Sequence, residues 1–72
     1  MNTTLAFRAS CSKLQATINT DLESGRIAWR MIEDLANGRR SLDELRDIAS
    51  KNGSKFEYAR VVLQEASYLL ND

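Results

Sequence analysis

The segment 20–38 carries the broadest run of apolar positions in the chain and holds its only Trp. When successive side chains are placed about 100° apart on a helix, these positions cover more than half of the circumference. The positions are Leu22, Ile27, Ala28, Trp29, Met31, Ile32, Leu35 and Ala36. A surface helix needs an apolar stripe only about 100° wide. The pattern therefore predicts a central helix that other helices, or a second copy of the chain, cover from several directions.

Capping residues mark both ends of this predicted helix. Thr20 and Glu23 have the spacing of a capping box, in which each side chain accepts a hydrogen bond from the backbone of the other residue. Asn37 and Gly38 tolerate the left-handed conformation that ends many helices. The polar arc of the helix is made of charged residues, Glu23, Arg26, Arg30, Glu33 and Asp34. Their spacing of three or four predicts ion pairs along the helix.

The preceding segment, 4–18, has a narrower apolar pattern with the a/d spacing of a coiled coil. This N-terminal seam consists of Phe7, Cys11, Leu14 and Ile18. The seam runs in phase into the central helix, which favours one helix over 4–36 with Gly25 inside it at a cost of about 1 kcal/mol. The capping box favours two helices broken near Thr20. We expect a homodimer with this seam at or near its interface.

A short helix is predicted over 42–51. Ser41 and Glu44 form a second capping box in front of it. Asn52 and Gly53 supply the residues that end it.

A last helix is predicted over 55–70, because Ser54 and Glu57 have the spacing of a third capping box. We expect it to pack antiparallel on the central helix. Val61 and Tyr68, seven residues apart, form an apolar strip separate from its main apolar face. The whole pattern predicts an all-α fold, a single domain over 1–72 built as a small hairpin or bundle of three to four helices, forming a homodimer.

Composition narrows the range of functions. The chain has 72 residues, and ten basic and ten acidic side chains give it no net charge, which argues against strong non-specific attraction to nucleic acid or membranes. No apolar run approaches the roughly 20 residues of a membrane-spanning helix. One Cys and no His leave no internal disulfide and no usual zinc pattern. We expect a cytoplasmic protein without metal or cofactor. The Ser- and Thr-rich start faintly resembles a mitochondrial presequence, but the in-phase seam favours an amphipathic helix.

Candidate catalytic residues are few. Cys11 has no His to act as its base, and its place on the seam indicates a buried structural thiol. The paired carboxylates at 33–34 and 43–44 lie on faces that are predicted to be solvated. Catalytic carboxylate pairs need environments that drive their pKa values apart. We therefore expect no enzymatic activity.

Residues 42–70 resemble the helix-turn-helix class of DNA-binding regulators. Ala49 takes the small-residue position, Gly53 the turn glycine and Val62 a late core position. Three positions depart from the usual pattern: Asn52, Ser54 and Ala59. The segment that would read DNA has acids as well as bases, namely Lys55, Glu57, Arg60 and Glu65. The resemblance implies a transcriptional regulator, which is the alternative hypothesis.

The favoured hypothesis is a small non-enzymatic protein that binds and modulates another protein. Aromatic, Met and Arg side chains are enriched at interfaces. The candidate anchors are Leu22, Trp29, Met31, Val61 and Tyr68. Arg39 and Arg40 follow a helix end, where the helix dipole favours cations; contact with an acidic partner or phosphate is their functional alternative. In size and helical make-up the chain resembles accessory proteins of phages and plasmids, which implies a role as an inhibitor or anti-repressor.

Overall fold

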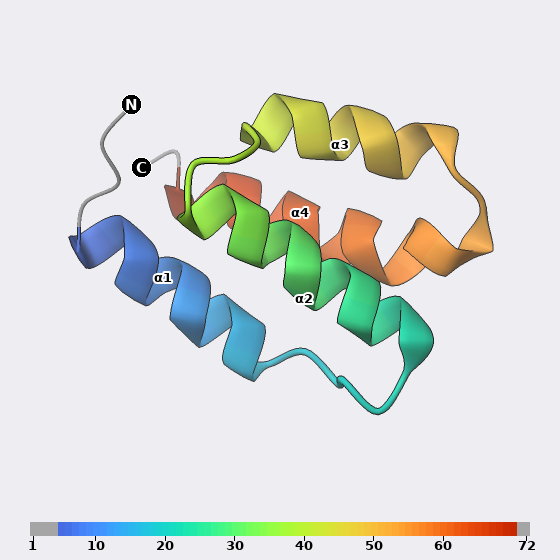
Figure 1. The fold of residues 1–72 in the computed structure, drawn as a ribbon, viewed down its shortest axis with the longest axis horizontal. Coiled ribbons are helices and arrows are strands. Elements are labelled where there is room, and N and C mark those ends of the chain that lie inside the picture. The colour runs from blue at the N-terminus through green and yellow to red at the C-terminus, as the bar shows by residue number, and fades with distance from the viewer. Residues whose placement is uncertain (1–4, 71–72) are drawn as a thin grey trace.

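The computed structural model describes residues 5–70, which form an all-helical bundle and contain no β-strand (Figure 1). The helices are α1 (Leu5–Ala16), α2 (Glu23–Ala36), α3 (Leu42–Lys51) and α4 (Glu57–Leu70), with a single 3-10 turn, η1 (Ser54–Phe56), before α4. The all-α prediction is confirmed for this part of the chain. The predicted start of the first helix at Thr4 lies outside the described residues. Within residues 5–70, no helix has both the length and the apolar character needed to cross a membrane.

The centre of the bundle is the contact between α2 and α4, which run in the same direction (Figure 1). α1 packs against both of these helices, and α3 packs mainly against α4. An ion pair of 3.5 Å between Lys55 and Glu23 joins the starts of the two central helices. The predicted antiparallel packing of the last helix is therefore wrong, because α3 reverses the chain once more between α2 and α4.

One apolar core lies between the four helices. Its large members are Cys11, Leu14, Ile18, Met31, Ile32, Leu35, Leu45, Val62 and Leu63. Alanines fill the remaining buried positions of the core, Ala28, Ala49, Ala59 and Ala66. Small side chains allow helices to approach closely, so a chain of this length can bury a continuous core around α4.

The expected single helix does not form, because a loop over 17–22 separates α1 from α2. Gly25, inside the first turns of α2, explains the break. A Cβ built there would lie 2.8 Å from the carbonyl carbon of Asn19 and would overlap its oxygen. The loop over 17–22 therefore packs on the α2 backbone at a point where only glycine leaves room.

The predicted capping box at Thr20 does not form. α2 instead follows Leu22, whose side chain makes no capping hydrogen bond. The Arg26 guanidinium donates from Nη1 to the backbone oxygens of Thr20 at 3.0 Å and Asp21 at 3.2 Å, so it holds the loop from the helix side. The other end of α2 is as predicted, since Gly38 adopts the left-handed conformation with φ 72°.

The capping box in front of α3 is confirmed. The Glu44 backbone N–H donates to Ser41 Oγ at 3.1 Å, and the Ser41 N–H donates to Glu44 Oε1 at 2.9 Å. The bounds of α3 match the predicted 42–51. The next start differs from the prediction, because Ser54 opens the 3-10 turn and the α-helix begins only at Glu57.

Candidate functional site

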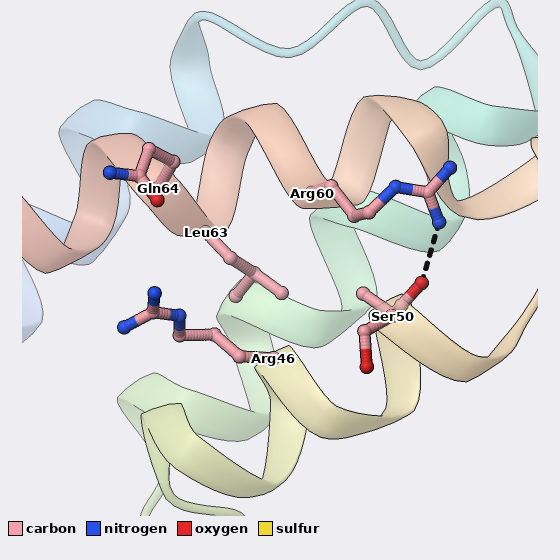
Figure 2. A pocket seen from close by; sticks show the side chains of 6 residues that line it. Arg46, Ser50, Arg60, Leu63 and Gln64 are labelled. Carbon is pink, nitrogen blue, oxygen red and sulfur yellow. Dashed lines mark hydrogen bonds between the residues drawn. The ribbon is translucent and has the colours of Figure 1, made fainter.

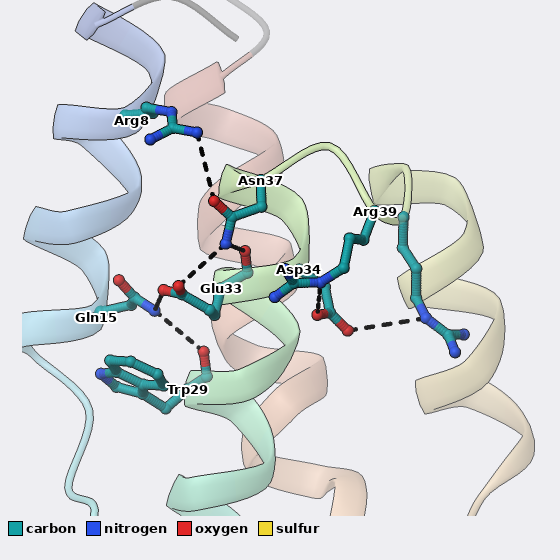
Figure 3. A network of polar contacts seen from close by, with 8 residues as sticks. Arg8, Gln15, Trp29, Glu33, Asp34, Asn37 and Arg39 are labelled. Atoms are coloured by element: carbon teal, nitrogen blue, oxygen red, sulfur yellow. Dashed lines mark hydrogen bonds and ion pairs between the residues drawn. The ribbon is translucent and has the colours of Figure 1, made fainter.

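A polar network centred on Glu33 joins α1 to α2 (Figure 3). The amide of Gln15, which is only 9% exposed, donates to Glu33 Oε1 at 3.1 Å and to the Trp29 carbonyl oxygen at 3.2 Å. Asn37 Nδ2 donates to Glu33 Oε2 and to the Glu33 carbonyl oxygen, each at 3.0 Å. The Arg8 guanidinium donates to Asn37 Oδ1 at 3.4 Å. Polar bonds thus fix the position of α1 along the length of α2.

The network perturbs two ionisable groups. The hydrogen bonds from Gln15, and then from Asn37, lower the pKa of Glu33 by stabilising its carboxylate. Burial raises the pKa of the Cys11 thiol, and the nearby charge of Glu33 raises it further. Cys11 is 1% exposed, which confirms the predicted buried thiol. A raised pKa keeps it in the less nucleophilic thiol form.

Sequence reasoning missed this network because it placed Glu33 on a solvated arc of charges. The available signal was Gln15, a polar residue directly beside the apolar seam of α1. A buried amide needs hydrogen-bond partners, and a facing carboxylate supplies them.

The ion pairs predicted within α2 are replaced by pairs to the loop that follows it. Asp34 binds Arg39 at 2.9 Å and Arg40 at 3.8 Å, so both cations have a structural partner within the chain. Glu33 is held by the amides of the network. Arg30 consequently has no acidic partner among the described residues. An acidic-partner or phosphate contact by Arg39 and Arg40 stays a prediction.

The N-terminal seam packs against other helices of its own chain. Cys11, Leu14 and Ile18 are buried in the core, and Phe7 is half-buried against it. The prediction that the seam forms a dimer interface is therefore wrong in its location, because these side chains already pack on α2 and α4. The a/d spacing describes a helix packed on its own bundle.

Four of the five candidate anchors are exposed. Leu22 is 48% exposed, Trp29 36%, Val61 66% and Tyr68 67%. Met31 is the exception, since it is 7% exposed and belongs to the core. It lies on the side of α2 that packs against the bundle, so its assignment as a surface anchor is corrected.

We define the α2 outer face by Leu22, Arg26, Trp29 and Arg30. A hollow of about 170 Å³ on α2 is lined by Glu23, Arg26, Ile27 and Arg30, residues on either side of Trp29 in the sequence. Figure 3 shows the indole of Trp29 at the edge of α2 next to Gln15. The face therefore combines an aromatic ring, a hollow lined mainly by charged residues and two cations, neither of which has an acidic partner among the described residues.

A second hollow, of about 190 Å³, lies between α3 and α4 and is lined by Arg46, Ala49, Ser50, Arg60, Leu63 and Gln64. Figure 2 shows the guanidinium groups of Arg46 and Arg60 at opposite ends, with Leu63 between them. Arg60 Nη1 donates to the carbonyl oxygens of Ala49 at 2.6 Å and Asn52 at 3.2 Å. Arg60 thus satisfies backbone groups at the end of α3, and the two arginines do not converge on one point.

The arrangement of α3 and α4 bears on the DNA-binding alternative. The two helices run side by side in opposite directions (Figure 1), whereas the helices of a helix-turn-helix cross at roughly 90–120°. The outward side of α4 presents Glu57 and Glu65, and its Arg60 is turned toward α3. None of these observations favours the DNA-binding alternative, which stays an untested prediction.

We define the α4 strip by Glu57, Val61, Glu65 and Tyr68. Gln64 Nε2 donates to Tyr68 Oη at 3.0 Å, which lays the phenol back along the helix. Leu69, one residue further along α4, is also exposed.

Known proteins supply no further guide to these surfaces. Among residues 5–70, no three His, Cys, Asp or Glu side chains are grouped so that they could hold a metal ion. Comparison of the chain with protein-family models, with curated proteins and with solved structures gives no match.

Proposed function

We propose that this chain is a small non-enzymatic regulatory protein that binds and modulates another protein through the α2 outer face. The observation that supports this most directly is Trp29. Its large ring is partly exposed on a helix whose position is fixed by the hydrogen bond from Gln15 to the Trp29 carbonyl oxygen. Beside it stands Arg30, which has no acidic partner among the described residues. Trp and Arg are the residue types most enriched at binding hot spots.

The size of the α2 outer face suits such a contact. Leu22 and Arg30 are eight residues apart, a rise of about 12 Å along a helix. The chain exposes 4891 Å², and a standard interface of about 800 Å² per partner takes roughly a sixth of that surface. The hollow lined by Glu23, Arg26, Ile27 and Arg30 adds a concave, mainly polar part to this side of α2.

The mode of action belongs to the same proposal. A chain of this size acts by occupying a surface of its target, as an inhibitor or anti-repressor does, and we place it in the cytoplasm. A homodimer is part of the proposal as well. Because the seam is buried, the dimer contact would use exposed faces. Light scattering at micromolar concentration tests the homodimer separately, and a monomer at that concentration contradicts it.

The test is affinity capture from extracts of the source cell with the full chain as bait. Trp29→Ala should lower recovery of the specific partner at least tenfold, since a hot-spot side chain contributes about 2 kcal/mol or more. Leu5→Ala is the matched control, because Leu5 is an exposed apolar residue away from this face. Circular dichroism checks that both variants are folded. Recovery that is equal with Trp29→Ala and Leu5→Ala contradicts the proposal.

A further inference from the structure

The α4 strip is a second exposed surface with a different chemical character. Val61 and Tyr68 are among the most exposed large hydrophobic side chains of the described chain, at about two thirds of their area. Glu57 and Glu65 are exposed beside them. The strip thus alternates acidic and apolar residues along the outward side of one helix.

The negative charge of the α4 strip is not neutralised within the described residues. Neither Glu57 nor Glu65 takes part in an ion pair there. The two nearby cations in sequence are engaged elsewhere, because Arg60 binds the end of α3 and Lys55 binds Glu23. No ion pair within the described residues therefore competes with a partner's cation for these two carboxylates.

The geometry of the strip matches the side of a second helix. Its four residues lie at spacings of four, four and three, so they form one row over a rise of about 16 Å. The hydrogen bond from Gln64 holds the Tyr68 side chain along this row. A side chain that is already positioned loses less entropy when a partner binds.

We propose that the α4 strip is a docking face for a basic amphipathic helix of a protein partner. Apolar residues of that helix pack on Val61 and Tyr68, and its Lys or Arg side chains pair with Glu57 and Glu65. A cation over the Tyr68 ring adds a further attraction. Amphipathic helices dock on helical proteins through apolar anchors at this kind of spacing, and the charge of the strip selects a basic partner.

This inference is independent of the proposed role of the α2 outer face. The two faces lie on different helices and share no residue, and α2 lies in front of α4 in Figure 1. The two faces also differ in charge, since Arg26 and Arg30 stand on the first and two carboxylates on the second. One chain can therefore hold two partner segments at the same time.

The test selects peptides from a displayed library of helix-forming sequences whose outward positions contain Lys, Arg, Asp, Glu and apolar residues in equal proportion. The full chain is the bait. Peptides that bind the strip should carry about three or more basic residues for each acidic one. A synthetic copy of such a peptide should bind the E57Q/E65Q variant about tenfold more weakly, as expected for the loss of two solvent-exposed charge pairs.

Matched variants separate the charge of the strip from general effects. Asp21→Asn removes an exposed carboxylate in the loop before α2 and should change binding less than twofold. Tyr68→Ala should weaken binding more than tenfold, and Trp29→Ala should leave it unchanged. This last result separates the inference from the proposed function, because either face can fail while the other still binds.

Three results would overturn the inference. The first is a selection without enrichment in basic residues. The second is equal binding of the peptide to E57Q/E65Q and to D21N, both folded by circular dichroism. The third is self-association of the wild-type chain that E57Q/E65Q abolishes in sedimentation experiments, since the strip would then be an interface between copies of this chain.

Discussion

The two halves of the bundle, α1–α2 and α3–α4, are both pairs of neighbouring helices but are held together differently. In the first half, the loop packs on the α2 backbone at Gly25, and the amide of Gln15 forms a buried bridge to Glu33. In the second half, a capping box starts α3, and Arg60 binds the carbonyl oxygens at its end. The bridge of the first pair joins residues 18 apart, whereas the box that starts α3 joins residues three apart and the Arg60 bond at its end spans 11.

This difference explains how far each half can be understood from local signals. A capping box is made by residues three apart, so the same short sequence gives the same helix start in many folds. A glycine under a loop or an amide facing a carboxylate acquires its role only after the chain has folded. We therefore expect α1–α2 to be the more sensitive half when a single long-range contact is removed.

Gly25→Ala should produce the largest effect. Its new Cβ would overlap the Asn19 carbonyl oxygen, and backbone atoms cannot move aside as a flexible side chain can. Overpacking typically costs about 1–3 kcal/mol, and the Gly-to-Ala gain in helix propensity of about 1 kcal/mol offsets part of it. Because this overlap is severe, we expect a net loss of about 2 kcal/mol in the free energy of unfolding, measured by urea denaturation.

The matched control is Gly53→Ala in the second half. No heavy atom lies within 4 Å of a Cβ built at Gly53, so its effect should stay within about 0.5 kcal/mol. If Gly25→Ala is as stable as the wild-type chain, the loop does not pack on α2 in the way described, and the contrast between the two halves disappears.

The second prediction concerns the buried amide. Gln15→Met keeps the length of the side chain but removes both of its hydrogen bonds, to Glu33 and to the Trp29 carbonyl oxygen. Loss of these two partly buried hydrogen bonds, one of them to a charged group, costs about 1–2 kcal/mol. Intrinsic fluorescence should also change, because Trp29 is the only Trp and lies beside the amide.

Gln64→Met is the corresponding change in the second half. Among residues 5–70, the Gln64 amide bonds only to the exposed Tyr68 hydroxyl, so the free energy of unfolding should change by less than about 0.5 kcal/mol. Equal losses for the two substitutions in urea denaturation would show that the Gln15 bridge contributes no more than a surface contact.

The sequence allowed a correct prediction of the helical class, the bounds of α3 and the end of α2. Each rests on a local pattern: apolar periodicity, the box at Ser41, and the left-handed residue Gly38. The start of α4 was predicted too early, because Ser54 opens a 3-10 turn. Exposure of Val61 and Tyr68 also followed from the pattern, because they form a strip apart from the main apolar face of their helix.

The errors came from features that a pattern leaves undetermined. The a/d spacing of Cys11 and Leu14 fits a helix packed on another copy or on its own chain, and only the fold shows which. α2 and α4 run in the same direction because α3 reverses the chain between them. The apolar pattern of α3 does not show which helix it packs against. Arg30 was expected to form an ion pair within its own helix. Asp34 instead binds Arg39, and Glu33 accepts a hydrogen bond from Asn37.

The smallest effect is expected from pH, and it compares one carboxylate in each half. The pKa of Glu33 is lowered mainly by the amide of Gln15, a residue of α1, and the pKa of Glu44 mainly by the backbone N–H of Ser41. A carboxyl whose pKa is lowered on folding stabilises the fold above its ordinary pKa and loses that contribution as pH falls through the folded value. The free energy of unfolding should therefore decline in the acid range, below the ordinary Glu pKa of 4.5.

Urea denaturation at a series of pH values tests this. Glu33→Gln and Glu44→Gln should each make the acid decline shallower. The two carboxylates are held by different parts of the chain. The Gln15 bond to Glu33 joins two helices, whereas the Ser41 bond to Glu44 lies at the start of one helix. In a Gln15→Met background, Glu33→Gln should therefore change the decline much less, whereas Glu44→Gln should act as it does in the wild-type chain. An equal effect of Glu33→Gln in both backgrounds would mean that the carboxylate is held from α2 alone, and the network would then not join the two helices.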